Sequence, residues 1–276
     1  IMLWDIDGIV MRRKYEFKNF PDRAKFASGS LALVSVRSEG VVLFDLSAWR
    51  VIKTYPESTL LSISRDKRFF SSMHGGVLSL RNTTSGDIYK NHKFDGSCYI
   101  DIRDTAFSPD GRYVAFGGTK NAFGCSSAYN FEIFVWDLRS DKIIRNLTGH
   151  REGTVASAFS PDGRYLLTGS MDATARLWDF TNGNSISLVS GDRDWVIFND
   201  QGYFDASREG GELVNVSSVM DVFAIDQFAL KSNRPDMLMR SMGIGSLSAI
   251  NHYSNEFRKR LRKFGIGEST LGHELQ

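Results

Sequence analysis

One stretch of this sequence occurs twice with little change. Residues 104–118 read DTAFSPDGRYVAFGG, and residues 156–170 read ASAFSPDGRYLLTGS. Each copy is followed by an apolar segment that ends in Trp-Asp, and the two tryptophans, Trp136 and Trp178, are 42 residues apart. A fixed period of this length indicates a repeated structural unit, which cannot bury its apolar faces alone and must stack on its neighbours.

Weaker copies of the pattern lie on both sides of this pair. In chain order they are Leu3-Trp4-Asp5, Leu43-Phe44-Asp45, LSISRDKRFFSSM at residues 61–73 with VLSLRN at 77–82, and WVIFNDQGYFDAS at 195–207. In the last of these, Phe198 falls on the position of Phe107 and Phe159. The repeat therefore covers most of residues 1–207.

Short apolar segments separate the turns of the repeat. Residues 165–167, 175–178 and 186–189 are rich in residues that favour β-strands. Pro-Asp-Gly lies between such segments because Pro presets the first turn position and Gly tolerates positive φ near its end. The sequence predicts an all-β protein of four-stranded sheets, arranged radially so that neighbouring sheets cover each other's faces.

The repeat and its Trp-Asp pairs resemble the WD-repeat family of β-propellers, whose period is about 40–45 residues. The most complete copy covers residues 147–188 and includes Gly149-His150. The resemblance implies that this copy holds a hydrogen-bonded structural network, made of His150, Thr168 or Ser170, Asp172 and Trp178. In such a network His150 maintains the fold and has no chemical role.

The resemblance also implies a partial WD-repeat β-propeller in residues 1–207, with four to five blades of the seven that are usual in the family. We expect the chain to enter the first blade midway and the missing blades to come from sequence upstream of Ile1. Residues 208–276 are expected to form a helical C-terminal extension packed on the last blade.

An insertion distinguishes the copy that contains Trp136 from the copy that contains Trp178. The copy with Trp136 is ten residues longer, and the extra residues lie around residues 119–130, which read TKNAFGCSSAYN. Insertions within a repeat map to loops on one face, which is often the binding face. Phe123, Cys125 and Tyr129 are therefore candidate anchors for a partner, although they could instead pack over the propeller rim.

The C-terminal region has helical signals in place of the β pattern. Asn233-Arg234-Pro235-Asp236 is typical of a helix start, and Ser246 is placed to cap a second helix that ends near Gly265. An apolar stripe at steps of three or four follows Ser246 and predicts a buried helix face: Leu247, Ile250, Tyr253, Phe257, Leu261 and Phe264.

A basic run lies at the end of this second helix, formed by Arg258, Lys259, Arg260, Arg262 and Lys263. It could bind nucleic acid or an anionic membrane. The helix macrodipole offers a simpler explanation, because it favours cations at a helix C-terminus by about 0.3–1 kcal/mol each. No second basic cluster accompanies the run, so nucleic acid is not the expected partner.

The same region carries a second resemblance. DWVIFNDQGYFDAS at 194–207, FAIDQF at 223–228 and RPDML at 234–238 are similar to a segment of bacterial WD-repeat proteins. In those proteins the segment joins a propeller to a downstream caspase-like peptidase domain. The resemblance implies that this chain is the recognition or regulatory part and that any peptidase lies beyond Gln276. Cys98 and Cys125 lack the local motif of such a nucleophile.

The totals restrict the remaining classes of function. Two cysteines make no disulfide framework or metal knuckle, and no apolar run is long enough for a membrane span. The net charge of +2 argues neither for nor against a polyanionic partner. The sequence has neither a glycine-rich phosphate-binding loop nor the Gly-x-Ser-x-Gly motif that carries the nucleophile in many hydrolases. Its histidines are too scattered to suggest a ligand set: His74, His92, His150, His252 and His273.

We therefore expect a non-enzymatic, cytoplasmic protein without cofactor or metal that binds a protein or peptide partner. The partner would contact loops on one propeller face or the mouth of the central channel. Two alternatives remain open at this point. One is a propeller hydrolase with its active site at the channel mouth, and the other is binding of nucleic acid or an anionic membrane through the basic helix.

Overall fold

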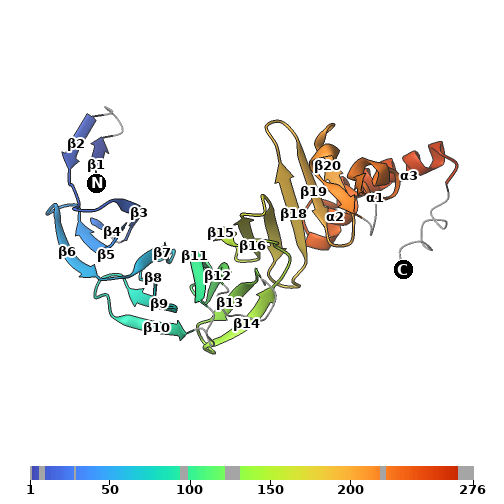
Figure 1. Cartoon of the computed structure of the whole chain (residues 1–276). Coiled ribbons are helices and arrows are strands. Elements are labelled where there is room, and N and C mark those ends of the chain that lie inside the picture. The colour runs from blue at the N-terminus through green and yellow to red at the C-terminus, as the bar shows by residue number, and fades with distance from the viewer. Residues whose placement is uncertain are drawn as a thin grey trace. The chain divides into compact units, whose positions relative to one another are not determined.

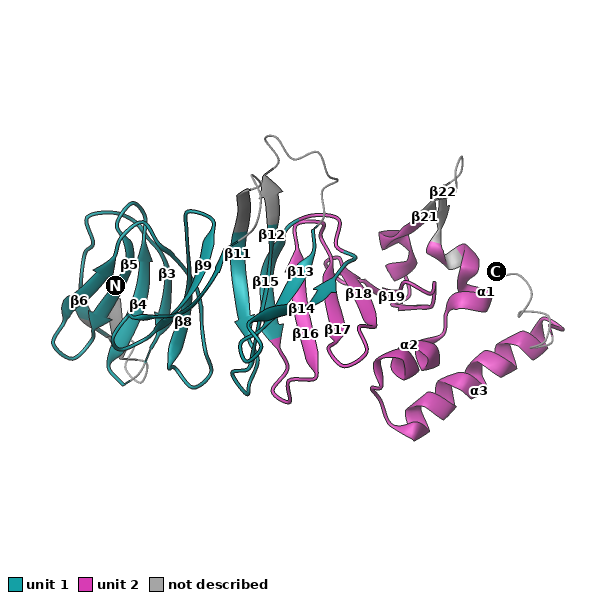
Figure 2. Cartoon of the chain, turned by 90° about the horizontal axis from the view of Figure 1, so that it is seen from below, with its two compact units in different colours: residues 1–149, 153–158 teal, residues 150–152, 159–276 magenta. Residues whose placement is uncertain are grey.

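The computed structural model describes residues 2–5, 10–27, 29–93, 99–121, 131–217 and 222–266. Antiparallel strands dominate, and the helices lie after the last large sheet (Figure 1). The predicted all-β fold with a helical C-terminal segment is confirmed. The chain forms two compact units, residues 1–149 with 153–158 and residues 150–152 with 159–276 (Figure 2).

Unit 1 holds three four-stranded sheets whose strands pair in chain order. They are preceded by the pair β1 (Met2–Asp5) and β2 (Val10–Lys14). The first sheet is β3 (Pro21–Phe26), β4 (Leu31–Val36), β5 (Gly40–Asp45) and β6 (Arg50–Tyr55). The second is β7 (Thr59–Ile63), β8 (Phe69–His74), β9 (Val77–Asn82) and β10 (Ile88–Lys93). The third is β11 (Tyr99–Phe107), β12 (Tyr113–Asn121), β13 (Ile133–Asp137) and β14 (Lys142–Leu147), and β15 (Thr154–Phe159) follows.

Unit 2 contains one large sheet and the described helices. Its sheet strands are β16 (Tyr165–Ser170), β17 (Ala175–Asp179), β18 (Ser185–Ser190), β19 (Trp195–Asn199) and β20 (Phe204–Ala206), paired in chain order. The remaining elements are η1 (Gly210–Leu213), the pair β21 (Asn215–Ser217) and β22 (Val222–Ala224), η2 (Ile225–Phe228), α1 (Ala229–Ser232), α2 (Pro235–Met242) and α3 (Leu247–Lys263).

Both predicted helix starts are confirmed. Pro235 occupies the first turn of α2, where its missing N–H removes no hydrogen bond. Ser246 caps α3, and its Oγ accepts a 3.1 Å hydrogen bond from the Ala249 backbone N–H. Gly265 follows the end of α3 with φ 68°, the left-handed conformation that favours glycine at this place.

The Ser-Pro-Asp-Gly-Arg-Tyr motif repeats because it builds one hydrogen-bonded turn. Ser108 Oγ donates to Asp110 (2.6 Å), and Asp110 accepts from the Arg112 N–H (3.0 Å). The Tyr113 N–H then donates to Ser108 Oγ (2.8 Å). The same bonds form in the turns that begin at Ser64 and Ser160. The serine and aspartate of the motif thus recur because their side chains form the hydrogen bonds of the turn, and the glycine recurs because it fits the turn backbone.

Apolar side chains hold neighbouring sheets of unit 1 together. Leu33 and Leu43 of the first sheet pack with Leu60 and Phe70 of the second. On the other face of the second sheet, Leu78 and Leu80 pack with Val114, Phe116 and Trp136 of the third. Every one of these residues is almost completely buried, so the core of this unit lies between its sheets.

A β-bulge interrupts the fourth strand of each sheet in unit 1. The register with the third strand shifts at Ile52 in β6, at Tyr89 in β10 and at Ile144 in β14. The three residues hold equivalent places. Each comes one position after the residue that pairs with Phe44, Arg81 or Trp136 of the third strand, respectively. A bulge twists an edge strand and leaves one residue without a ladder partner, which discourages a further strand from pairing.

Strand β18 pairs with β17 without such a bulge. Trp178, Leu177, Arg176 and Ala175 pair in unbroken register with residues 185–188. The outer edge of β18 pairs with β19 along five residues, from Ile186 opposite Asn199 to Ser190 opposite Trp195. Strand β18 corresponds to β6, β10 and β14. The sheet of unit 2 therefore continues beyond its fourth strand, whereas the described sheets of unit 1 end at theirs.

This pairing shows what the weaker copy of the pattern at residues 195–207 forms. The segment echoes the repeated strand and turn in sequence, but it does not begin a further four-stranded sheet. Its residues instead form β19 and β20, which extend the existing sheet of unit 2. The apolar alternation of the segment suits either role, and in this chain it pairs with the regular edge of β18.

We predict that restoring the bulge detaches β19. Insertion of one isoleucine between Ser185 and Ile186 keeps Ile186 opposite Leu177 but distorts the edge that β19 uses. Amide hydrogen exchange in residues 195–199 should become about tenfold faster or more. The same insertion after Asp192, in the exposed turn between β18 and β19, is the control. Unchanged exchange in the first variant would refute the role of the bulge.

Candidate functional site

The residues of the predicted structural network lie in unit 2, and four of the five form a connected chain of hydrogen bonds. His150 Nδ1 lies 3.0 Å from Asp172 Oδ2, and its Nε2 lies 2.9 Å from Thr168 Oγ1. Trp178 Nε1 donates to the same Thr168 oxygen at 2.9 Å. Since the Asp172 carboxylate only accepts, the proton sits on Nδ1, and Thr168 donates to Nε2.

Burial sets the protonation of this chain of hydrogen bonds. It lowers the pKa of His150, and the hydrogen bond to Asp172 opposes only part of that effect, so the imidazole is neutral at pH 7. Burial by itself raises the pKa of Asp172. Hydrogen bonds from Thr174, from the Arg151 N–H and from His150 outweigh it and lower that pKa to about 2.

The order hydroxyl, imidazole, carboxylate is also that of a hydrolase triad, so access to solvent decides its meaning. Thr168 is 1% exposed and the His150 side chain is 0% exposed. The Thr168 oxygen also accepts from Trp178, which holds it inside the sheet. A nucleophile must reach a substrate carbon, and this hydroxyl is enclosed by its own unit.

Ser170, the alternative to Thr168, lies outside the chain of hydrogen bonds. Its Oγ donates to the Glu152 carbonyl (2.9 Å) and accepts from the Asp172 N–H (3.2 Å). Thr168 is thus the hydroxyl that contacts the histidine, and Ser170 fixes the turn that carries Asp172. Sequence alone could not choose, since the two residues are only two positions apart on β16.

The predicted partner-binding loop mostly lies outside the described residues. Phe123, Cys125 and Tyr129 all fall in the range 122–130. The first three residues of the expected insertion, 119–121, continue strand β12, where Lys120 pairs with Ile100. Cys98 is also outside the described part of the chain.

Only two of the six residues in the predicted apolar stripe of α3 are buried, namely Phe257 and Leu261. Ile250 is half-buried and Tyr253 is exposed. Leu247 is 70% exposed and Phe264 is 63% exposed. The prediction that the whole stripe is buried is therefore wrong.

Arg260 of the predicted basic patch turns inward. Its Nη2 donates a 2.6 Å hydrogen bond to the Asn233 carbonyl, and the guanidinium lies 5.4 Å from the ring centre of Phe257. Arg234 contacts the same ring at 3.9 Å. Arg260 thus joins α3 to the segment before α2, as a structural contact.

The other four basic residues of α3 have exposed side chains: Arg258, Lys259, Arg262 and Lys263. Lys259 forms a 2.7 Å ion pair with Glu256 one turn earlier, which offsets part of the positive charge. The basic run is therefore divided between an inward structural contact, an ion pair on the helix surface and exposed cations, and it does not form one uniform patch.

Sequence reasoning missed a polar network on the first strands of unit 1. Arg23 on β3 donates to the carbonyls of Leu61 (2.9 Å) and Arg103 (3.2 Å), and it lies 3.7 Å from Asp104. Asp104 accepts from the Ser157 N–H on β15 at 2.7 Å. One arginine and one aspartate thus join β3, β7, β11 and β15. The one signal in the sequence is that Asp104 stands where the second copy has alanine.

A groove of about 470 Å³ lies along residues 14–21, between β2 and β3. Tyr15 and Phe17 on this segment pack edge-to-face on Phe44, with ring centres 4.7 and 6.2 Å apart. Phe20 at the end of the segment is 83% exposed. The groove is open to solvent, and the exposed aromatic ring of Phe20 in its lining is a candidate anchor for a partner.

The described part of the chain offers neither a metal site nor a membrane span. Within residues 2–266, outside the undescribed gaps, no group of three His, Cys, Asp or Glu side chains could hold a metal ion. Among the helices of these same residues, none has the length and apolar character that crossing a bilayer requires.

Comparison with known proteins places the best-formed repeat. Residues 141–179 match the family model described as WD domain, G-beta repeat. The chain contains a WD repeat. The matched segment includes His150, Thr168, Asp172 and Trp178, so the hydrogen-bonded chain described above lies inside it.

Several relatives match parts of the chain. Protein groucho of Drosophila melanogaster is 38% identical over 90 residues, which cover 33% of this chain and 10% of the relative. The U3 small nucleolar RNA-associated protein 21 homolog of Schizosaccharomyces pombe is 29% identical over 164 residues, or 59% and 17%. Human WD repeat-containing protein 36 is 43% identical over 54 residues, or 20% and 6%. The chain thus spans less than a fifth of the length of each.

Removal of the Thr168 hydroxyl should destabilise this WD repeat. Thr168→Val preserves the shape but leaves His150 Nε2 and Trp178 Nε1 buried without their partner. We expect a loss of about 1–3 kcal/mol in the free energy of unfolding, measured by urea denaturation. Ser170→Ala is the matched control and should cost under about 1 kcal/mol. Equal losses in the two variants would contradict the assignment.

His150 should make stability depend on pH. Its pKa is lower in the folded state than the ordinary 6.5, so the unfolded chain binds the proton more readily and acid favours unfolding. Below about pH 6.5 the free energy of unfolding should fall by up to about 1.4 kcal/mol per pH unit. Thermal melts between about pH 7.5 and about pH 5.5 should show a steeper fall for the natural protein than for His150→Gln. Parallel profiles would show that another group causes the dependence.

Proposed function

We propose that this chain is a protein–protein recognition scaffold and that the groove along residues 14–21, with Phe20 beside it, is a partner-binding site. The observation that carries the proposal is the exposure of Phe20 next to an open groove. A large apolar side chain in water costs free energy, which a partner's apolar surface would recover.

The use of polar side chains inside the repeats supports a binding role over a catalytic one. His150, Asp172 and Thr168 are hydrogen-bonded to one another and buried. The Arg112 guanidinium forms two hydrogen bonds with Asp137 (3.2 and 3.0 Å) and holds the pKa of that carboxyl well below its usual range. Groups that are saturated in this way serve the architecture and are not free to act on a substrate.

The partner is proposed to be a protein or a peptide. Nucleic acid is less suited, because Arg260 of the basic run is used inside unit 2 and Lys259 is paired with Glu256. The WD repeat at residues 141–179 and the WD repeat named in human WD repeat-containing protein 36 are consistent with a scaffold.

We further propose that the chain acts as the recognition part of a larger protein of bacterial type with a caspase-like peptidase domain. The support is the resemblance of residues 194–207, 223–228 and 234–238 to the joining segment of such proteins. Groucho and the other two relatives named above are eukaryotic, so they do not bear on this point. Reading the genomic sequence on both sides of the coding region tests it, and a flanking region without a Cys/His peptidase domain would refute it.

Replacement of Phe20 should abolish partner capture. We expect affinity capture from native extract with Phe20→Asp to lose proteins that the natural chain retains, because an aspartate cannot fill an apolar contact. The matched control is Phe264→Asp, which changes another exposed phenylalanine, in unit 2. Bound proteins are compared by quantitative mass spectrometry. Retention of the same proteins by Phe20→Asp would remove this groove as the site.

A further inference from the structure

The turn that the repeated motif builds has one copy that differs from the other two in charge. Residues 108–113 and 160–165 both read SPDGRY, with one aspartate and one arginine each. Residues 64–69, between β7 and β8, read SRDKRF. This copy has one aspartate and three cations, which are Arg65, Lys67 and Arg68. We call residues 64–69 the basic turn.

Two of these cations stand where the other copies have the residues that favour a turn. Arg65 replaces the proline of the motif, and Lys67 replaces its glycine. Lys67 has φ 62°, whereas Gly111 and Gly163 at the equivalent place have φ 68° and 74°. This left-handed conformation is strained for a residue with a side chain, and such strain is concentrated at functional sites. The hydrogen bonds of the turn do not require either cation, so their presence indicates a use outside the turn.

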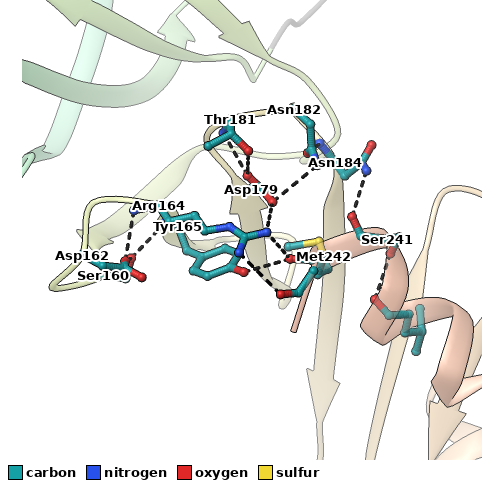
Figure 3. Close-up of polar contacts among 12 residues, drawn as sticks. Ser160, Asp162, Arg164, Tyr165, Asp179, Thr181, Asn182, Asn184, Ser241 and Met242 are labelled. Atoms are coloured by element: carbon teal, nitrogen blue, oxygen red, sulfur yellow. Dashed lines mark hydrogen bonds and ion pairs between the residues drawn. The ribbon is translucent and has the colours of Figure 1, made fainter. Parts of the chain in front are cut away.

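In both SPDGRY copies the arginine is bound to a carboxylate. Arg112 Nε and Nη2 donate to the Asp137 carboxylate at 3.2 and 3.0 Å. Arg164 Nη2 donates to Asp179 at 3.0 Å and also to the Met242 carbonyl at 3.1 Å (Figure 3). Each of these arginines is therefore occupied by contacts within its own unit.

Arg68 lacks such a carboxylate, because the third strand of its sheet has asparagine at that position. Phe69 pairs with Asn82 in the register in which Tyr113 pairs with Asp137. Among the residues that the structure describes, none accepts a hydrogen bond from the Arg68 guanidinium or forms an ion pair with it. The basic turn thus carries a guanidinium whose usual partner in this repeat is missing.

The side chain of Asn82 cannot serve as that partner. Its Oδ1 accepts hydrogen bonds from the backbone N–H groups of Thr84 and Ser85 at 2.9 and 3.0 Å. Asp137 Oδ1 does the same for the Arg139 N–H at 3.0 Å. An aspartate has a second oxygen for the arginine, whereas the amide nitrogen of Asn82 only donates. Asn82 therefore keeps the turn and leaves Arg68 without an acceptor.

Arg68 lies beside a pair of aromatic rings. Its guanidinium carbon is 5.4 Å from the ring centre of Phe69, and the Tyr89 ring is 4.6 Å from that same centre. Tyr89 is the bulged residue of β10 and is 50% exposed, and Arg68 is exposed as well. Tyrosine and arginine are enriched among the residues that dominate binding energy at interfaces. We call Arg68, Phe69 and Tyr89 the Arg68 patch.

We propose that the Arg68 patch binds an acidic segment of a partner protein. An aspartate or glutamate of the segment pairs with Arg68, in the place that Asp137 holds beside Arg112, and a neighbouring apolar side chain covers Tyr89. The charges of Arg65 and Lys67 favour an acidic segment. Nucleic acid is less suited, because its affinity comes from many phosphate contacts and the basic turn has three cations. The patch shares no residue with the groove at residues 14–21, so the two proposals can fail independently.

The probe is a phage-displayed library of random peptides, selected on the full natural chain after removal of peptides that also bind the Arg68→Ala variant. We expect the retained peptides to be enriched in aspartate or glutamate next to an aromatic or leucine side chain. The most enriched peptide is synthesised with a fluorescein label and titrated with the chain by fluorescence anisotropy. Its version with the acidic residue changed to the amide should bind about tenfold more weakly or worse. Selection without enrichment of acidic residues would overturn the proposal.

The deciding variant is Asn82→Asp, which gives Arg68 the internal carboxylate that Arg112 already has. Peptide binding should weaken about tenfold or more, because the new aspartate competes with the acidic residue of the peptide. The chain should stay folded, since Asp45 accepts the same backbone hydrogen bonds in the first sheet, and circular dichroism verifies this. The matched control is Arg139→Ala, an exposed arginine in the turn before β14, which should leave binding unchanged. Equal affinity of Asn82→Asp and the natural chain would overturn the proposal.

The same variants distinguish two rival occupants. If the natural chain self-associates in sedimentation equilibrium, Asn82→Asp is monomeric and the peptide does not compete, then the patch is an interface between copies and the proposal is wrong. If a labelled single-stranded RNA of random sequence binds through Arg68 and the peptide does not, the partner class is wrong. Peptide binding to a monomeric chain that is lost in Asn82→Asp supports the proposal. None of these results depends on Phe20, so failure of the groove leaves them unchanged.

Discussion

The large sheets in the described part of the chain carry apolar faces, and an apolar face is not stable in water. Burial of apolar surface contributes about 25 cal/mol per Å², so the arrangement of the chain follows from what covers each face. In unit 1 the cover is the next sheet, through pairs such as Leu43 with Phe70 and Leu80 with Trp136. In unit 2 it is helix α2, through Leu238 and Met242. The need to cover an apolar sheet face is thus met by a sheet in unit 1 and by a helix in unit 2.

The edges of the sheets pose a second requirement, because an open edge presents unpaired backbone groups. Fourth strands in unit 1 carry a bulge at Ile52, Tyr89 or Ile144. In unit 2 the regular strand β18 pairs with β19, and the next edge, at β20, is bridged by Asn233, since Phe204 and Asn233 pair in parallel. Both units therefore protect their edges, one by distortion and the other by extension.

Much of the fold could be predicted from local patterns, and long-range features could not. The Ser-Pro-Asp-Gly-Arg-Tyr turn, the Pro235 helix start and the Ser246 cap each depend on residues within a few positions of one another. Residues 195–207 echo the repeat in sequence, and their pairing with β18 as a further pair of strands in the same sheet is a long-range contact that no local pattern indicates. In the candidate site, the choice of Thr168 over Ser170 depended on which hydroxyl of β16 contacts His150, and no periodicity indicates that contact.

The bulges in the outer strands have an evolutionary consequence. A bulge is one extra residue, so removal of a single codon from an outer strand would straighten its edge and allow a following hairpin to join the sheet. Unit 2 shows the outcome of such a state, with β18 regular and β19 attached. A repeat array of this kind can thus lengthen one sheet sideways without adding a new repeat, and the register of the fourth strand acts as the switch.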